Sequence, residues 1–280
     1  MTTIIKANSI IRGRFNNYDL YTARCVNFLY YHAQINSKKE GFDNKLIFFM
    51  TDIREEMGLQ NIGNYAKVIE RSLKNLTTTF TEENETVVKT VPFTPKSSKN
   101  GKSEDLPIEI IKELHIVKKH AYVCEITLSE EFIELLVKSE NQWTKISLDV
   151  VMGFKSLYTL LFYENMKSWA GQEYIKFSLD ELNEMFYTSY KNYAPLEIII
   201  KRSLKEMALL VDNLDIEVSY HKEKYYKPIT FTIKKLIDEQ ARLKAVKINK
   251  KRLQEEKESD IDVNALVAKI KNKMKKTNNI

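Results

Sequence analysis

Two short stretches of the chain nearly repeat each other, ERSLKNL at residues 70–76 and KRSLKEM at residues 201–207. The tripeptide Asn-Tyr-Ala precedes each of them, at residues 64–66 and 192–194. In both copies, apolar side chains recur at the spacing of one helix face, and lysine and arginine lie on the opposite face. The repeat therefore predicts two copies of one helical unit.

A second helix is expected directly before each repeated stretch. The sequences LIFFMTDIREEMGL (46–59) and YIKFSLDELNEMFY (174–187) each contain a short strand-like run and then a helix. Thr51 and Ser178 are the expected N-cap residues of these helices, because their hydroxyls can accept a hydrogen bond from the first turn. A polar turn follows each helix, so both units have the order helix, turn, helix.

Further elements around each pair complete a known small fold. A longer helix is expected before each pair, at residues 20–35 and 147–169, and residues 214–235 alternate as in a β-hairpin with a polar tip. Three helices followed by a hairpin make a winged helix. The wing strands of the first unit are expected in LTTTF (76–80) and HAYVCEITL (120–128). The Lys-, Ser-, Thr- and Pro-rich segment 82–107 between them is interpreted as a mobile loop.

The expected fold class is α+β, mainly α, with two tandem winged-helix domains that carry small β-hairpin wings. The first domain spans residues 1–140 and the second spans residues 141–235. Residues 236–280 form a basic tail, for which a short amphipathic helix and a disordered end remain open alternatives.

The charge of the chain is concentrated at its C-terminal end. The net charge is +6, and residues 234–280 alone carry 14 Lys or Arg against 7 Asp or Glu, which leaves the remainder close to neutral. A DNA-binding surface in the globular part must therefore come from local clusters of charge. No apolar run is long enough to span a membrane and the N-terminus lacks the pattern of a signal peptide, so we expect a cytoplasmic protein without a membrane partner.

Motifs for catalysis or for a cofactor are not found. Gly58 and Gly63 have the spacing of a P-loop, but Asn64 and Tyr65 stand where lysine and serine or threonine must follow. No two histidines flank a single residue, as a metal-dependent nickase requires. The two cysteines, which lie far apart in apolar runs, are expected to be buried free thiols: Cys25 and Cys124. We expect no enzyme activity, no cofactor and no metal.

The basic helix faces instead indicate binding to double-stranded DNA, because a recognition helix in the major groove lets lysine and arginine reach guanine or phosphate. Ile198 is an apolar residue on such a face. Contact with a thymine methyl group and packing against another part of the chain both remain open for it. The candidate DNA-binding residues are Lys67, Arg71, Lys74, Lys191, Asn192, Tyr193, Ile198, Lys201, Arg202, Lys205, Lys222 and Lys224.

Several stretches in a fixed order resemble the Rep family of iteron-binding plasmid replication initiators. They are IKANSII (5–11), the junction-like segment 125–167 with its KSLY and FYE motifs, FSLDELNEMF (177–186) and IIKRSLKEM (199–207). The likeness runs from about residue 4 to residue 235. The chain departs from the family pattern at Leu161 and Glu197, where basic residues are common.

The resemblance implies a protein that binds origin repeats (iterons), promotes opening of the origin and recruits the host replicative helicase and initiator proteins. It further implies a dimer formed through the N-terminal domain that represses its own gene, with the second winged helix as the main reader of the DNA sequence. The alternatives are a winged-helix transcriptional repressor and, from another class, a protein-interaction scaffold that does not bind DNA.

Overall fold

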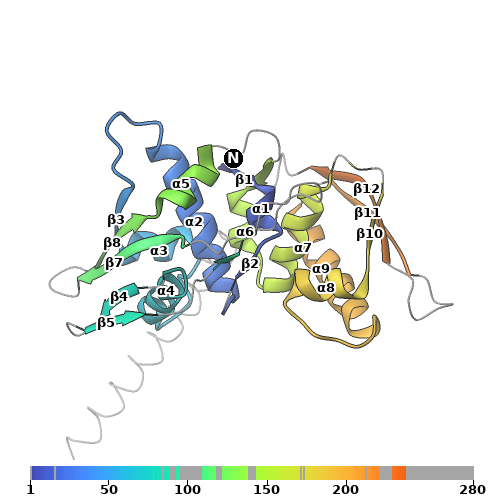
Figure 1. Cartoon of the computed structure of the whole chain (residues 1–280). Coiled ribbons are helices and arrows are strands. Elements are labelled where there is room, and N and C mark those ends of the chain that lie inside the picture. Colours follow the sequence, from blue (N-terminus) through green and yellow to red (C-terminus); the bar gives the residue numbers. More distant parts are fainter. Residues whose placement is uncertain are drawn as a thin grey trace, which may run out of the picture.

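The chain folds into two modules that are joined along their first strands, as the computed structural model shows (Figure 1). The structure describes the following residues: 2–15, 17–77, 79–82, 85–88, 93–94, 109–117, 122–137, 143–170, 172, 174–211, 213–220 and 229–237.

The first module, residues 2–137, contains the first helix-turn-helix and its sheet. Its elements are β1 (Thr3–Ala7), α1 (Asn8–Ile11), β2 (Arg14–Phe15), α2 (Leu20–Asn36), β3 (Lys45–Phe49), α3 (Met50–Glu56), α4 (Tyr65–Lys74), β4 (Thr79–Glu82), β5 (Glu85–Val88), β6 (Phe93–Thr94), β7 (Ile111–Val117), β8 (Val123–Leu128) and α5 (Glu130–Val137). The second module, residues 143–237, repeats much of this order. Its elements are β9 (Trp143–Ser147), α6 (Leu148–Gly153), α7 (Leu157–Ser168), β10 (Ile175–Phe177), α8 (Leu179–Phe186), α9 (Ala194–Leu210), β11 (Asn213–Ser219) and β12 (Ile229–Ile237).

Each module has a three-stranded antiparallel sheet with the same arrangement. The strand orders are β3-β8-β7 and β10-β12-β11, so the strand that leads into the helix-turn-helix pairs with the last strand of the hairpin in both modules. Figure 1 shows the two sheets at opposite ends of the molecule, with α1, α6 and α7 between them. The expectation of two tandem winged helices is confirmed.

The repeated sequence occupies the same place in α4 and α9. Ile69 and Ile200 are buried, and so are the serines three residues further on, Ser72 and Ser203. In this way α4 packs on α2 and α9 packs on α7. A serine takes little room, and the distance between two packed helices depends on the side chains at their contact. The sequence repeats because the same contact between helices is made twice.

The two modules exchange their first elements. β1 pairs with β9 in antiparallel register, with Thr3 opposite Ser147. α1, which follows β1, packs on α7 of the second module, whereas α6, which follows β9, packs on α2 of the first. The sequences agree with this relation, because IIRG at residues 10–13 corresponds to VVMG at residues 150–153. An approximate twofold axis thus relates the modules, and their buried residues form one continuous core.

The single helix expected at residues 147–169 is in fact two helices. α6 ends at Gly153 and α7 begins at Leu157, because Phe154 and Ser156 have extended backbone conformations. The carbonyl oxygen of Phe154 accepts a hydrogen bond from the buried guanidinium of Arg24. The break therefore lies where the first module binds the backbone of the second.

The wing of the first module also differs from the expectation. The strand in LTTTF, β4, pairs with β5 and not with the strand in HAYVCEITL, whereas that second strand, β8, lies between β3 and β7. The segment 82–107, which was expected to be a loop, contains β5 and β6, and its other residues after Glu82 lie outside the described residues. β4 and β5 are adjacent in the chain and pair locally, whereas β6 pairs with β2 near the N-terminus. The tail beyond Ile237 also lies outside the described residues.

Of the two expected N-caps, one is confirmed and one is wrong. The hydroxyl of Ser178 accepts a hydrogen bond from the Glu181 amide, and the Glu181 carboxylate accepts one from the Ser178 amide, which completes a capping box at α8. α3 begins at Met50, one residue before Thr51, and Phe49 at its N-cap position makes no side-chain cap.

Both cysteines are buried free thiols, as expected. Burial raises the pKa of the Cys124 thiol to about 12, so this group remains protonated at neutral pH. Within the part of the chain that the structure describes, no group of three or more His, Cys, Asp or Glu side chains could hold a metal ion. None of the described helices is both long enough and apolar enough to cross a membrane.

Candidate nucleic-acid interface

The basic face of α4, the second helix of the first helix-turn-helix, is partly neutralised by neighbouring acids. The guanidinium of Arg71 lies 2.6 Å from the carboxylate of Asp19, the N-cap residue of α2. The ammonium group of Lys74 lies 3.0 Å from the carboxylate of Glu70, one turn earlier on the same helix. Lys67 is exposed. Two of the three candidate cations on α4 are therefore paired within the first module.

α9, the equivalent helix of the second module, presents cations of a different kind. Arg202 and Lys205 are exposed, and neither has an ion-pair or hydrogen-bond partner among the described residues. Lys201 is held more closely: its Nζ atom lies 3.7 Å from Glu197 Oε2 and 5.1 Å from the centre of the Tyr220 ring. Burial, and secondly the charge of Glu197, raise the pKa of Tyr220 to about 12. Two cations of α9 thus remain available to an external anion.

Ile198 lies on this same exposed surface of α9. Its side chain is 51 % exposed, and it stands one helical turn before Arg202, so the two side chains are neighbours on the helix surface. The described residues do not bury it. A contact with the segment beyond Ile237 lies outside the described residues.

The turn between α8 and α9 contributes further candidates. Lys191 and Asn192 are exposed, and the side-chain oxygen of Asn192 accepts a hydrogen bond from the Ala194 amide at 3.2 Å. Tyr193 is half-buried, and burial raises its pKa. Asn192 therefore shapes the start of α9, whereas Lys191 is exposed on the turn. The last two candidates lie outside the described residues: Lys222 and Lys224.

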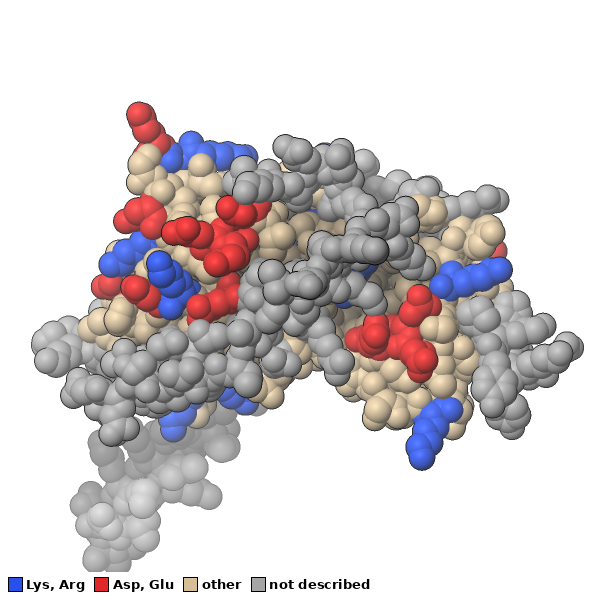
Figure 2. Space-filling view, viewed as in Figure 1, with Lys and Arg blue, Asp and Glu red and all other residues tan. Residues whose placement is uncertain are grey.

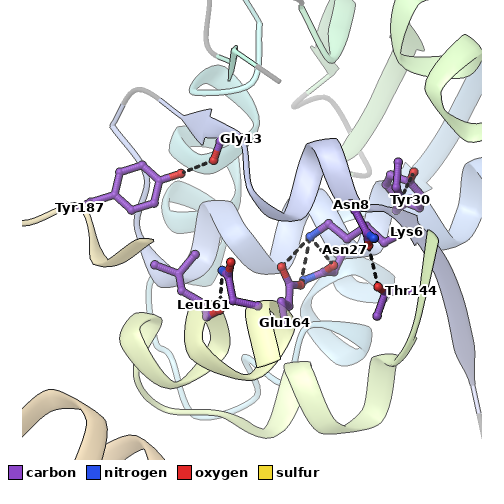
Figure 3. A network of polar contacts seen from close by, with 11 residues as sticks. Lys6, Asn8, Gly13, Asn27, Tyr30, Thr144, Leu161, Glu164 and Tyr187 are labelled. Carbon is purple, nitrogen blue, oxygen red and sulfur yellow. Dashed lines mark hydrogen bonds and ion pairs between the residues drawn. The ribbon is translucent and has the colours of Figure 1, made fainter. Parts of the chain in front are cut away.

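A buried ion pair fixes the two helix-turn-helix units relative to each other (Figure 3). Lys6 on β1 is 1 % exposed, and its Nζ atom lies 2.8 and 3.0 Å from the two carboxylate oxygens of Glu164 on α7, itself 2 % exposed. Asn27 on α2 accepts a hydrogen bond from Lys6 at 3.2 Å and donates one to Glu164 at 2.9 Å. Buried charges are tolerated where each is paired and hydrogen-bonded in this way.

The approximate twofold axis explains why these three residues meet. Asn27 is the eighth residue of α2 and Glu164 is the eighth residue of α7, so they are equivalent positions of the two modules. Lys6 binds both of them from β1. The sequence alone did not predict this site. One signal was available. Lys6 stands two residues after Ile4 in the same strand, so both side chains lie on one face of β1, and Ile4 is buried.

Tyr187 forms a second connection between the modules, at the turn of the second helix-turn-helix. Its hydroxyl accepts a hydrogen bond from the Phe15 amide at 3.0 Å and donates one to the Gly13 carbonyl at 3.3 Å (Figure 3). Its backbone is left-handed, with φ of 55°, at the position where the first module has Gly58 with φ of 67°. A residue other than glycine is unusual there. The contacts with the first module hold Tyr187 in this conformation.

The surface charge is distributed unevenly over the molecule. Figure 2 shows acidic side chains gathered in two areas of the face that it draws. Basic side chains lie among and above those on the left, at the right end, and at the lower edge below the positions of α4 and α8 in Figure 1. One acidic area lies over α8, whose first turn carries Asp180 and Glu181.

The chain is similar to known proteins. The family model of the first winged helix of initiator replication proteins matches residues 3–167, more than half of the chain. Among solved structures, the Pi initiator protein in complex with iteron DNA is similar with a TM-score of 0.61 and 13 % identity, over 85 % of this chain and 98 % of that chain. Domains 2 and 3 of RctB are similar with a TM-score of 0.49 and 12 % identity, over 81 % of this chain and 85 % of that chain.

No curated protein matches the sequence. At 13 % identity, the likeness to the Pi initiator establishes a shared fold. The match to the family model extends from β1 to the end of α7 and so includes Lys6, Asn27 and Glu164. By this match, the chain belongs to the family of initiator replication proteins.

Proposed function

We propose that this protein is a plasmid replication initiator that binds repeated origin sequences (iterons) in double-stranded DNA through both of its helix-turn-helix units. One observation carries the proposal: α4 and α9 are equivalent second helices of two winged helices, both present cations to solvent, and the Lys6–Glu164 pair joins their modules. A helix of this kind fits the major groove. The shared fold with a Pi initiator bound to iteron DNA supports it.

The two recognition helices have different tasks in this proposal. α9 is the main reader of the sequence, because Arg202 and Lys205 are exposed without an acidic partner among the described residues. α4 contributes contacts to the DNA backbone, since Arg71 must leave Asp19 before it can bind another anion. Phosphate contacts position a protein on DNA, whereas base contacts give specificity.

A footprint of the protein on the DNA upstream of its gene tests the proposal. We expect protection of direct repeats over two successive major grooves, and log affinity should fall linearly with log salt by roughly 0.9 for each phosphate contact. The double variant Arg202→Ala, Lys205→Ala serves as the matched control, because its exposed substitutions leave the fold intact while protection is lost. Equal affinity for unrelated duplexes in the wild-type protein would contradict the proposal.

The proposal places the protein in the cytoplasm and assigns it no catalytic step. Bound to the iterons, it opens the adjacent duplex and recruits the host replicative helicase and initiator proteins. The purified protein should neither nick DNA nor hydrolyse ATP. Either activity in the wild-type preparation, if it is absent from an equal preparation of the Arg202→Ala, Lys205→Ala variant, would show that the protein does catalyse a step. A single operator in place of direct repeats would favour the transcriptional repressor instead.

We further propose that the protein forms a dimer through the outer face of the β3-β8-β7 sheet and represses its own gene in that form. Phe49 on β3 is 53 % exposed, and Ile47 and Val117 on the same face are also exposed. Val123 on β8 lies opposite both Phe49 and Val117, so these side chains make one apolar row. Exposed apolar patches on a sheet of this kind mark contacts with other proteins.

Sedimentation over a range of protein concentrations tests the dimer. We expect the wild-type protein to associate and the Phe49→Asp variant to remain monomeric, because a buried unpaired charge is costly. Leu209→Asp is the control, since it places the same charge on an exposed apolar residue of α9 away from the proposed interface. Equal association of both variants would exclude this sheet as the interface.

A further inference from the structure

A cavity of about 610 Å³ lies where α1 of the first module meets α7, β10 and α8 of the second. This volume lies within the range of sites for small ligands. The wall combines apolar residues with polar and charged ones, including the carboxylates of Glu181 and Glu184 on α8. The residues that matter here are Asn8, Arg12, Asn165, Trp169 and Lys176.

Three polar groups of the wall lack hydrogen-bond partners. Asn165, 6 % exposed, donates from Nδ2 to the Leu161 carbonyl, but its Oδ1 atom has no partner among the described residues. Asn8, 9 % exposed, accepts from the Thr144 hydroxyl, and its Nδ2 atom has no described partner either. Trp169 Nε1 is buried and makes no hydrogen bond. Of the three, Trp169 Nε1 is the atom that is fully buried without a partner, so it is enclosed by protein and faces no ligand. The two asparagines offer one acceptor and one donor to a ligand.

Arg12 adds a flat surface and a positive charge. Its guanidinium lies 3.6 Å from the centre of the Trp169 ring and donates to the Ser168 carbonyl at 3.0 Å. No carboxylate pairs with it in the described part of the chain. Burial lowers the pKa of Arg12 to about 10, so the group is still charged at neutral pH. Lys176, exposed on β10, places a second cation in the wall.

The equivalent positions across the approximate twofold axis carry apolar side chains. By the approximate twofold axis, the positions of Asn8, Arg12 and Asn165 correspond to a leucine, a methionine and a phenylalanine, all of them buried: Leu148, Met152 and Phe28. The Phe28 ring packs against the rings of His32 and Phe48, with centroid distances of 4.5 and 4.8 Å. The same fold therefore carries apolar side chains at one set of positions and hydrogen-bonding or charged groups at the other.

We propose that this cavity binds one nucleotide, either free or as part of a single strand. The base stacks on the Arg12 guanidinium, its edge pairs with the Asn8 and Asn165 groups, and the phosphate lies beside Arg12 and Lys176. Bases carry both donors and acceptors on their edges and stack on arginine planes. An apolar ligand would leave the polar groups unpaired, and a simple anion would leave the acceptor of Asn165 without a donor.

Fluorescence of Trp169 reports binding directly. The chain has two tryptophans, so Trp143→Phe leaves Trp169 as the single emitter. We expect saturable quenching when this variant is titrated with dAMP or with a single-stranded oligodeoxyadenylate. Quenching by both ligands means that a free nucleotide suffices, and quenching by the oligonucleotide alone identifies a strand as the source. No saturable quenching by either ligand would overturn the proposal.

Two variants in the Trp143→Phe background locate the ligand. Asn165→Phe installs the residue of the first module, fills the cavity and should weaken binding at least tenfold. Arg12→Lys keeps the charge and removes the flat surface, and it should weaken binding as well. Unchanged affinity in both variants would overturn the proposal, and a thermal melt verifies that each one is folded.

The nucleotide site does not depend on the proposed binding of duplex DNA. The Lys205→Ala variant should weaken duplex binding and leave the nucleotide affinity unchanged, whereas Asn165→Phe should do the reverse. A negative result for nucleotide binding would therefore leave the proposal of duplex binding untouched, and a negative result for duplex binding would leave the nucleotide site untouched.

Discussion

The outer faces of the two sheets differ although their inner faces match. Leu46 on β3 and Ile175 on β10 are equivalent and both buried. On the outside, exposed Ile47 of the first sheet corresponds to exposed Lys176 of the second, which lies in a row with Thr230. The residues of each strand that face inward are thus determined by the common fold. The residues that face outward are free to carry a separate function in each module.

The recognition helices differ in the same sense. Arg71 on α4 is paired with Asp19, whereas the equivalent Arg202 on α9 has no described partner. The first module presents a sheet with a partly exposed apolar row at Phe49, Val123 and Val117, together with a partly neutralised helix. The second module presents a polar sheet and a helix on which Arg202 and Lys205 have no described partner. In the proposed function, one duplicated fold supplies one module for self-association and one module for reading DNA.

The largest expected effect concerns the pair that holds the modules together. Glu164→Ala leaves the ammonium group of Lys6 buried without a counter-charge, and we expect it to lower the free energy of unfolding by about 3–5 kcal/mol. The double variant Lys6→Met, Glu164→Leu should recover most of this loss, because apolar residues of similar size need no partner. Urea unfolding measures both, and a loss below about 1 kcal/mol in the single variant would mean that the pair does not hold the junction.

An exchange of residues between the two sheets tests their difference directly. Ile47→Lys should weaken self-association by about 2 kcal/mol, which is roughly 30-fold, because it places the charge of the second sheet in the proposed interface. Lys176→Ile, the reverse change, should leave self-association as it is. Analytical ultracentrifugation measures both. Weaker association in the Lys176→Ile variant would show that the interface lies on the β10-β12-β11 sheet and not on the β3-β8-β7 sheet.

The recognition helices are compared by matched arginine substitutions. Arg202→Ala should weaken specific DNA binding by about 1–3 kcal/mol if the side chain contacts a base. Arg71→Ala should cost less, because this arginine must first leave Asp19, and its effect should be the same for all DNA sequences. Titrations on iteron and scrambled duplexes separate the two effects. A greater loss of specificity in the Arg71→Ala variant would make α4, and not α9, the main reader of the DNA sequence.

The smallest effect on stability is expected at Ile198. Because the side chain is half exposed, Ile198→Ala should change the free energy of unfolding by no more than about 0.5 kcal/mol. If the side chain packs on a thymine methyl group, wild-type affinity should fall when that thymine is replaced by uracil. A large drop in melting temperature would show that Ile198 is buried against another part of the chain.

The local elements of the fold were predictable from the sequence, and the junction was not. The helix pairs, the β11–β12 hairpin and the Ser178 cap all follow from periodicities and spacings within a few residues. The pairing of β1 with β9 joins five-residue strands about 140 positions apart, and no local pattern specifies such a partner. The break after Gly153 was missed for a similar reason, because the residue that stabilises it, Arg24, lies in the other module.

In the candidate interface, too, local features were predictable from the sequence and contacts between distant residues were not. Arg202 and Lys205 are exposed on the helix face that the sequence indicated. The neutralisation of Arg71 depends on Asp19, which is 52 residues away. The helical periodicity of residues 65–74 therefore could not predict it. Lys6 illustrates the general difficulty. A lysine is almost never fully buried unless it is paired, and its partner Glu164 becomes visible only in the folded chain.

The pairing of β1 with β9 has a consequence for synthesis on the ribosome. β1 is among the first residues to emerge, but at a translation rate of about 5–20 residues per second its partner strand follows roughly 7–30 s later. Throughout this interval Lys6 has no Glu164 to neutralise it. A nascent chain that stops near residue 140 therefore holds every residue of the first winged helix and still lacks β9, α6 and α7, against which that module packs. Translation of the second module completes the first.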